Sequence, residues 1–144
     1  KENLWSYAKR NGVDSNRIKF APKVLIDEHI NRHQIIDLFL DTFPYNAHTS
    51  TSDTIWAECP VLTLSGKSFA SRVAGSILKE INCEELIASD DTGYYNKALE
   101  LYENPKELLR IKQKIIVGKN NSIIFKPDAF TINLEKIYSD LFTS

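Results

Sequence analysis

Residues 35–64 read IIDLFLDTFPYNAHTSTSDTIWAECPVLTL, and this stretch decides the fold. The apolar run Ile35–Leu40 predicts a buried strand, and Val61–Leu64 predicts a second strand. Between them, turn-forming residues fill Asp41–Ser50, and Thr51–Glu58 predicts a short helix. Two strands that are joined by a helix pair in parallel. The stretch therefore predicts a parallel sheet whose two faces are covered by helices.

The flanking sequence continues the alternation of helices and strands. On the N-terminal side, the pattern predicts a short strand over Arg17–Phe20 and a short helix over Asp27–Gln34. On the C-terminal side, it predicts a helix over Ala70–Ile81 and a short strand over Leu86–Ala88. Each of these elements adds a layer or an edge to the same sheet.

After residue 90 the sequence predicts helices alone. Asn104 is a capping residue, Pro105 suits the first helical position, and Glu107 stands three residues after the cap. Apolar residues at helical spacing mark a last helix: Phe130, Leu134, Ile137, Tyr138 and Leu141. We expect one α/β domain over residues 1–144. It has a Rossmann-like parallel sheet with helices on both faces over about 1–90, and a helical C-terminal tail over about 91–144.

The composition argues against several kinds of partner. The 144 residues carry 18 Lys and Arg against 19 Asp and Glu, a formal net charge of −1. Without a polybasic tract, we expect neither nucleic acid nor a membrane surface as the main partner. No apolar run approaches the ~18 residues of a membrane span, and we expect a cytoplasmic protein with reduced cysteines. Because the chain starts at Lys1 and holds no Met, we expect native residues upstream.

Two short patterns are similar to known binding motifs, but each lacks a residue that its motif requires. Gly66–Ser68 is similar to the end of a phosphate-binding P-loop, but Val61 stands where that motif needs a glycine. His29 and His33 lie one helical turn apart, yet a tetrahedral metal site needs more ligands than are grouped here. We therefore expect no metal site.

The segment Asp41–Asp53 carries the strongest chemical signal. It follows a predicted strand, and in parallel sheets ligands bind beyond the carboxyl ends of the strands. The first amides of a helix lack partners and, with the helix dipole, attract phosphate. Small hydroxyl residues allow close approach, and the Asp53 carboxylate can accept from sugar hydroxyls. The alternative is that these Ser and Thr residues simply cap the helix.

Six short motifs occur in a recognisable order: HINR at 29–32, DLFLDT at 37–42, HTS at 48–50, DTIWA at 53–57, PVLT at 60–63 and ASRVA at 70–74. Each motif is weak alone, but together and in register they resemble the C-terminal lobe of protein O-GlcNAc transferases. That family consists of GT-B glycosyltransferases related to SPINDLY-type proteins. The resemblance covers about residues 18–142.

The resemblance implies an enzyme with two Rossmann-like lobes and an active site between them. Such an enzyme transfers N-acetylglucosamine from UDP-GlcNAc to Ser or Thr hydroxyls of proteins, with inversion and without a cofactor or required metal. The residues that the resemblance assigns to nucleotide binding are His29 (stacking on uracil), Arg32 (a uracil carbonyl), the backbone of Val24 and Ile26 (the uracil edge), His48, Thr49 and Ser50 (diphosphate) and Asp53 (ribose).

The sequence departs from the family at several positions. Family members often carry Lys where Ile26 stands, and Gly where Ala47 and Thr51 stand. The family's phosphate-neutralising lysine, its acceptor-binding lobe and its tetratricopeptide repeats lie upstream of this segment. We therefore expect no catalytic residue in this chain, binding of the protein acceptor elsewhere, and nucleotide binding without turnover.

Two other interpretations stay open. The stretch DTFPY at 41–45 also resembles protein O-fucosyltransferases that use GDP-fucose, whereas His48 and ASRVA at 70–74 favour the N-acetylglucosamine branch. A non-catalytic, degenerate lobe is the third possibility; it would fold but bind no nucleotide.

Overall fold

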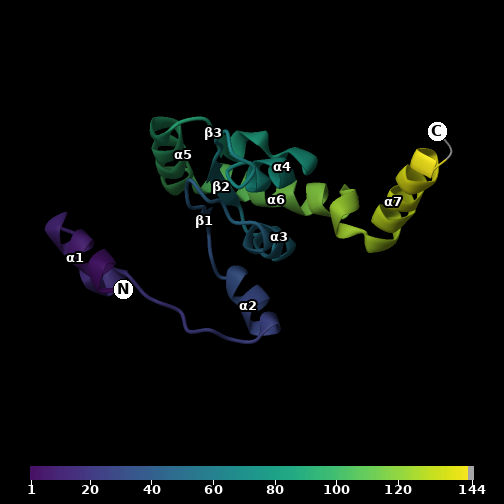
Figure 1. Cartoon of the computed structure of the whole chain (residues 1–144). Helices are drawn as coiled ribbons and strands as arrows, with labels where there is room; N and C mark the ends of the chain where they lie inside the picture. The colour runs from purple at the N-terminus through teal and green to yellow at the C-terminus, as the bar shows by residue number, and fades with distance from the viewer. Residues whose placement is uncertain (143–144) are drawn as a thin grey trace.

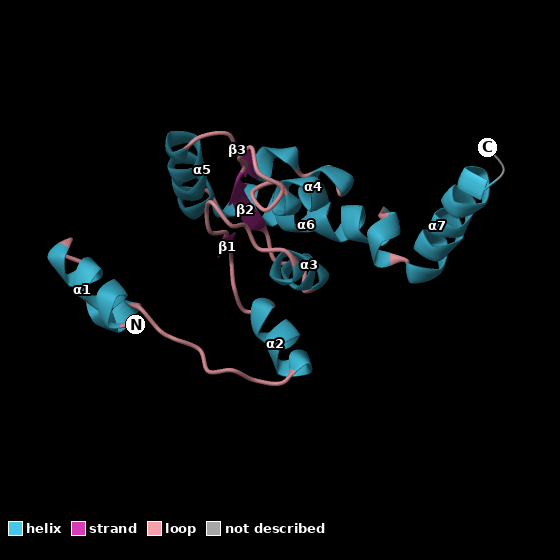
Figure 2. Cartoon of the chain, in the orientation of Figure 1, coloured by secondary structure: helices cyan, strands magenta, loops and turns pink. Residues whose placement is uncertain are grey.

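The computed structural model describes residues 1–142 (Figure 1). Its elements are α1 (Glu2–Arg10), η1 (Ser15–Arg17), α2 (Ile26–His33), β1 (Phe39–Leu40), α3 (Thr49–Trp56), β2 (Val61–Leu64), α4 (Val73–Glu80), η2 (Glu84–Leu86), β3 (Ile87–Ala88), α5 (Asp91–Glu103), α6 (Pro105–Asn121), η3 (Ile123–Phe125) and α7 (Pro127–Phe142). Helices surround three short strands, and α1 and α7 project from the body at opposite ends (Figures 1 and 2).

The three strands form a parallel sheet in the order β1-β2-β3. Phe39 of β1 pairs with Val61 of β2, and Thr63 of β2 pairs with Ile87 of β3. All four residues of β2 are buried. Because successive strand residues point to opposite faces, both faces of the sheet are covered. The predicted α/β class is confirmed.

The hydrophobic core joins helices from both halves of the chain to the sheet. α3, α4 and α5 contact β2, and α6 contacts α3 and α5. The buried cluster consists of Ile55, Val61, Leu78, Ile81, Cys83, Leu86, Leu101, Ile111 and Ile115. Burial of a large aliphatic side chain contributes about 1.5–3 kcal/mol, so this cluster is the main source of stability. That residues 1–144 form a single domain, divided near residue 90 into an α/β core and a helical tail, stays a prediction.

The predicted strand over Arg17–Phe20 is wrong. Arg17 is the last residue of η1, and residues 18–20 pair with no strand among residues 1–142. Its contacts are local instead: the Ile18 amide donates to the Ser15 carbonyl at 3.0 Å, and the Trp5 ring meets Phe20 edge-on at 5.2 Å. A strand pattern forms a strand where a neighbouring strand supplies the hydrogen bonds.

The predicted buried strand over Ile35–Leu40 is also wrong in extent and in burial. β1 contains only Phe39 and Leu40, while Ile35 is 86% exposed and Leu40 is 54% exposed. β1 lies at the edge of the sheet and pairs only with β2 among the described residues. With one edge unpaired, the apolar run lacks the second neighbour that would bury it.

Several predicted boundaries move by one to three residues. α2 begins at Ile26 instead of Asp27, α3 begins at Thr49 instead of Thr51, and β3 omits Leu86. α4 begins at Val73 rather than Ala70 because the preceding residues form a turn, in which the Ser71 and Arg72 amides donate to carbonyls at 68 and 69. The predicted helix start at Asn104 is confirmed: its side chain accepts from the Glu107 amide at 3.3 Å, and Pro105 opens α6.

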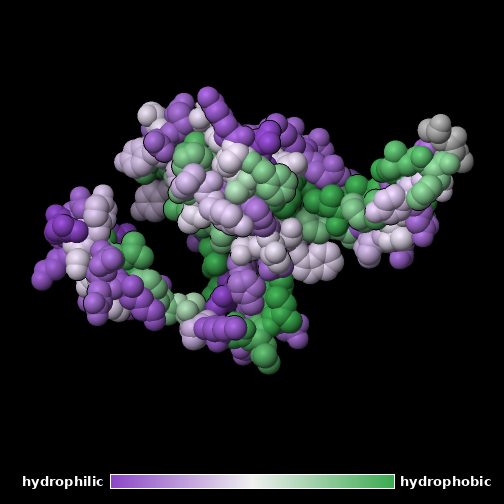
Figure 3. Space-filling model, viewed as in Figure 1, coloured by the Kyte–Doolittle hydropathy of each residue, from purple (hydrophilic) through white to green (hydrophobic). Residues whose placement is uncertain are grey.

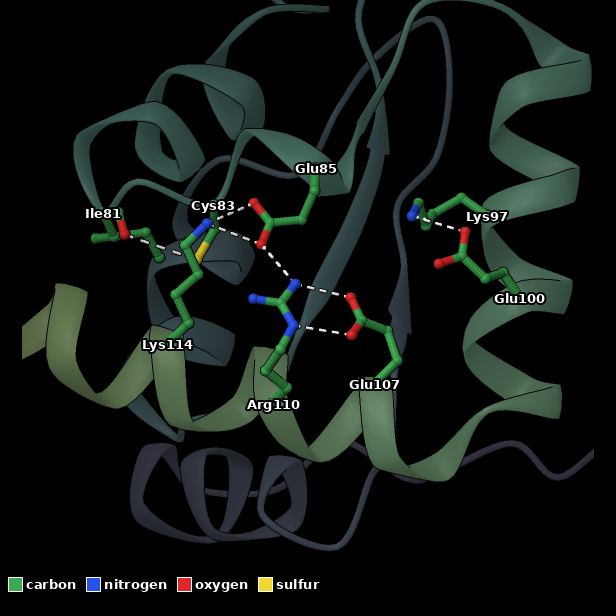
Figure 4. Close-up of polar contacts among 8 residues, drawn as sticks. All are labelled: Ile81, Cys83, Glu85, Lys97, Glu100, Glu107, Arg110 and Lys114. Atoms are coloured by element: carbon green, nitrogen blue, oxygen red, sulfur yellow. Dashed lines mark hydrogen bonds and ion pairs between the residues drawn. The ribbon is translucent and has the colours of Figure 1, made fainter.

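An ion-pair network fixes α6 against η2 (Figure 4). Lys114 donates to both carboxylate oxygens of Glu85 at 2.8 Å, and Arg110 reaches Glu85 at 3.3 Å and Glu107 at 2.7 Å. Burial acts to raise the pKa of Glu85, but hydrogen bonds from Lys114 and Arg110 outweigh it, so that pKa is lowered. Glu85 is therefore a partly exposed carboxylate whose lowered pKa favours the ionised form.

α7 leaves the body with most of its apolar side chains exposed. Phe130 is 50% exposed and Leu141 is 69% exposed. Apolar surface lies along this helix at the C-terminal end of the molecule (Figure 3). The helix that the apolar spacing predicted is thus present, with no core beneath it among the described residues.

Candidate functional site

A buried carboxylate organises the loop that follows β1. Asp41 is 6% exposed, and its Oδ1 accepts from the amides of Thr42 at 2.8 Å and Ala47 at 2.7 Å. Its Oδ2 accepts from the Thr63 hydroxyl of β2 at 2.7 Å. A buried charge is tolerated when hydrogen bonds satisfy it. Asp41 therefore ties both ends of the loop to the central strand.

Tyr94 and Asn46 hold the same loop from two further directions. The Tyr94 hydroxyl, on α5, donates to the Asp41 carbonyl at 2.8 Å. Burial, with a smaller contribution from the Asp41 charge, raises the pKa of Tyr94 to about 12, so the hydroxyl keeps its proton. The Asn46 amide nitrogen donates to the carbonyls of Thr42 at 2.8 Å and Leu64 at 3.3 Å. The loop is thus a rigid support for the start of α3.

The loop delivers the N-terminus of α3 beyond the carboxyl end of β1. The amides of Thr51 and Ser52 donate to the His48 carbonyl. Within residues 1–142, no group accepts from the amides of Thr49 or Ser50, and His48 makes no side-chain cap. The hydroxyl of Thr51 donates back to the Ala47 carbonyl at 2.9 Å. Two unpartnered amides and the positive end of a helix dipole are features that favour the binding of an anion.

The His48 ring is fixed beside this helix start. Tyr45 stacks on it with centroids 5.0 Å apart and planes 17° apart, and Phe69 meets it edge-on at 6.0 Å. Its Nε2 lies 3.4 Å from the Ala70 carbonyl, to which it can donate in the tautomer that carries the proton on Nε2. The ring is held by both loops that follow β1 and β2.

The structure brings His29 of α2 to Asp53 of α3. His29 Nε2 lies 3.7 Å from Asp53 Oδ2, and both side chains are about four-fifths buried. Arg32 donates through Nη2 to His29 Nδ1 at 2.5 Å and through Nη1 to the Pro22 carbonyl at 2.9 Å. Arg32 thus bridges the His29 ring and the Pro22 carbonyl, a role that the sequence did not predict.

Val24 and Ile26 lie where the chain enters α2. Val24 is half-buried and Ile26, the first residue of α2, is 62% exposed. Within residues 1–142, nothing accepts a hydrogen bond from either backbone amide. The sequence-predicted residues therefore fall in two clusters. In the first, direct contacts join Arg32, His29 and Asp53, and Val24 and Ile26 lie at the N-terminal end of the same helix α2. The second consists of His48, Thr49 and Ser50 at the start of α3.

Sequence reasoning missed Asp41, Asn46 and Tyr94 as supports of the site. One signal was available for Asp41, since a carboxylate directly after an apolar strand is rarely buried without partners. Nothing local in the sequence connects Tyr94 to Asp41, because 53 positions separate them.

Among the described residues, the cysteines and the possible metal ligands form no second candidate site. No group of three His, Cys, Asp or Glu side chains within residues 1–142 could hold a metal ion. Cys59 and Cys83 are free and buried, and burial raises the pKa of each thiol to about 11. Both stay protonated near neutral pH, so neither is an activated nucleophile. Within the same residues, no helix is both long and apolar enough to cross a membrane.

A comparison with protein families matches residues 1–134 to glycosyl transferase family 41. The chain is 29% identical over 140 residues to a UDP-N-acetylglucosamine–peptide N-acetylglucosaminyltransferase of Caenorhabditis elegans, covering 97% of this chain and 12% of that protein. It is 31% identical over 134 residues to the probable enzyme SEC of Arabidopsis thaliana, covering 92% and 14%.

Similarity extends to the SPINDLY branch and to a solved structure. The probable SPINDLY enzyme of Solanum lycopersicum is 26% identical over 142 residues, covering 98% of this chain and 15% of that protein. A point mutant of the O-GlcNAc transferase of Thermobaculum terrenum superposes with a TM-score of 0.85 at 26% identity, covering 95% of this chain and 26% of that chain. The chain thus spans roughly an eighth to a seventh of the length of these three curated relatives.

Proposed function

Since this chain belongs to glycosyl transferase family 41, we propose that it forms the donor-nucleotide-binding lobe of an inverting glycosyltransferase. The donor is UDP-GlcNAc, and the acceptors are Ser or Thr hydroxyls of proteins. The relatives' names describe transfer of N-acetylglucosamine to peptides, which supports this donor and this class of acceptor.

One arrangement carries the proposal: the unpartnered amides of Thr49 and Ser50 stand at the start of the helix that also bears Asp53. A diphosphate at those amides would gain charge-assisted hydrogen bonds and a favourable interaction with the helix dipole. Asp53 lies one turn further along α3, next to His29. A nucleoside attached to the diphosphate could therefore reach both side chains.

The two clusters divide the work of recognition. The His29 ring offers a face for stacking on a base, and the Asp53 carboxylate accepts hydrogen bonds from ribose hydroxyls. The amides of Val24 and Ile26 can donate to the edge of the base. Arg32 retains further N–H donors beside those used on His29 and Pro22, and one of them serves a uracil carbonyl.

The proposed lobe binds the donor but does not complete the reaction. Departure of a nucleoside diphosphate requires positive charge at the leaving oxygens. At the α3 start, the described residues supply backbone amides and the His48 ring. We propose that this chain alone contributes no catalytic residue, needs no metal or cofactor, and leaves acceptor binding to other parts of the protein.

The test is calorimetric titration of the chain with UDP and with GDP, each with and without EDTA. We expect saturable binding of UDP, weaker binding of GDP and no effect of EDTA. Preferential binding of GDP would replace the donor by GDP-fucose, and no binding of either nucleotide would indicate a degenerate lobe. A transfer assay with labelled UDP-GlcNAc should give no product from the chain alone, and measurable glycosylation would refute that part.

A further inference from the structure

His33 is a buried histidine to which the proposed function assigns no task. It is the last residue of α2 and the one buried residue among the eight of that helix, with 4% exposure. Its ring lies between the sheet and His29: it stacks on Phe39 of β1 at 6.3 Å and 29°, and meets the His29 ring at 4.6 Å and 79°. His33 thus connects the edge strand to the proposed base-stacking residue.

A hydrogen bond fixes the orientation of the His33 ring. Nδ1 lies 2.6 Å from the His29 carbonyl. A carbonyl can only accept, so Nδ1 carries a proton and donates it. Held at this atom and stacked on Phe39, the ring cannot turn without losing both contacts.

The His29 ring is in turn constrained at both nitrogens. Arg32 donates to Nδ1, which must be unprotonated to accept. A neutral His29 then carries its proton on Nε2, which faces the Asp53 carboxylate at 3.7 Å. The perpendicular His33 ring supplies the packing contact that keeps His29 in this orientation.

We propose that His33 is a positioning residue for nucleotide binding, which acts through His29 by holding its ring in the tautomer and orientation that face Asp53. The inference rests on the proposed function for the role of His29 as the base-stacking group. Preorganisation of a binding side chain reduces the ordering cost of the ligand-bound state. His33 itself need not touch the nucleotide.

The test is a double-mutant cycle on UDP affinity with His33→Phe, His29→Ala and the combined variant. Phe keeps the volume and ring of His33 but removes the Nδ1 donor. We expect His33→Phe to weaken UDP binding by about three- to tenfold, and to have no further effect once His29 is Ala, because coupled residues are non-additive. Asn31→Ala, an exposed residue of the same helix, is the matched control and should leave affinity unchanged.

The outcomes separate the two proposals. If His29→Ala leaves UDP affinity unchanged, the proposed base site is wrong. If His29→Ala weakens binding but His33→Phe does not, or if both weaken it additively, His33 is not a positioning residue.

A second measurement needs no nucleotide, so it tests the proposal even if the variants fail to bind UDP. The chain holds three histidines, so the ring nitrogens can be assigned by ¹⁵N NMR with one variant at each position. We expect His29 to show an unprotonated Nδ1, and His33→Phe to change the His29 signals into those of a mixture of tautomers. His33→Asn keeps a donor for the His29 carbonyl but lacks the ring that packs on His29, so it should give the same mixture. His29 signals that are unchanged in His33→Phe would overturn the proposal.

Discussion

Two carboxylates in this molecule accept hydrogen bonds from several donors, but their surroundings differ. Asp41 is 6% exposed and accepts from two amides and a hydroxyl. The Glu85 side chain is 23% exposed and accepts from Lys114 and Arg110 (Figure 4). Water can replace the partners of Glu85 but not those of Asp41. We infer that burial decides which carboxylate the fold depends on, since an unsatisfied buried group costs far more than a lost surface pair.

Asp41→Ala should destabilise the protein more than any of the substitutions below. It leaves the amides of Thr42 and Ala47 and the hydroxyl of Thr63 without their partner, so the free energy of unfolding should fall by about 3 kcal/mol or more. Urea unfolding measures the change. Asp37→Ala is the matched control, because Asp37 is an 87% exposed carboxylate with a single 3.7 Å contact to Lys112. Equal effects of the two variants would remove burial as the deciding factor.

Gly118→Ala tests whether packing, rather than the Glu85 network, holds α6 in place. A Cβ at Gly118 would lie 2.8 Å from the Ile81 Cβ and closer still to the Ile81 carbonyl. Overpacking of this kind costs about 1–3 kcal/mol of stability, measurable by urea unfolding. Gly75→Ala is the control, since its Cβ would meet Ile87 at an ordinary 3.6 Å. A neutral Gly118→Ala would show that α6 can shift.

Asp53→Ala asks whether a largely buried carboxylate serves binding rather than folding. We expect UDP affinity to fall by about 1–3 kcal/mol, because ribose hydroxyls lose their acceptor. The free energy of unfolding should change little, since the Asp53 carboxylate has one long contact, 3.7 Å to His29 Nε2, among the described residues. Calorimetry and thermal unfolding of the same samples measure both quantities, with the exposed Asp91→Ala as control. Unchanged affinity would exclude Asp53 from the site.

Glu85→Gln should give the smallest effect, below about 1 kcal/mol of stability. The pKa of Glu85 is lowered from its ordinary 4.5. A lowered folded-state pKa means that the stabilisation is fully present above about pH 4.5 and is lost as the pH falls through the folded value. The difference in unfolding free energy between wild type and Glu85→Gln should therefore shrink below pH 4.5 and at high salt. A difference that grows on acidification would contradict the assigned ion pairs.

Local sequence signals predicted the parts of the fold that local physics controls. Val61–Leu64 formed the central strand, and the Asn104-Pro105 signal opened α6 at the predicted residue. The hydroxyl-rich segment after β1 became a helix start with unpartnered amides at Thr49 and Ser50. In each case the apolar run, or the capping residues, sufficed to specify the structure.

The remaining predictions failed where a distant partner decides the outcome. The strand pattern at Arg17–Phe20 pairs with no strand among residues 1–142, and the apolar run Ile35–Leu40 yielded two strand residues at an exposed edge. Within the site, the contact of Arg32 with His29 and the hydroxyl of Tyr94 on Asp41 were not predicted. Sequence patterns carry no information on the presence or reach of such partners.

The sequence by itself determined the α/β class, the central strand and the approximate position of the α3 start, because periodicity and capping act over a few neighbouring residues. Tertiary structure alone decided which carboxylate is buried, which strand pattern finds a neighbour and how the Tyr94 hydroxyl reaches Asp41. Those outcomes depend on contacts between residues that are distant in the chain. Burial in a shared core sets the energies of these contacts.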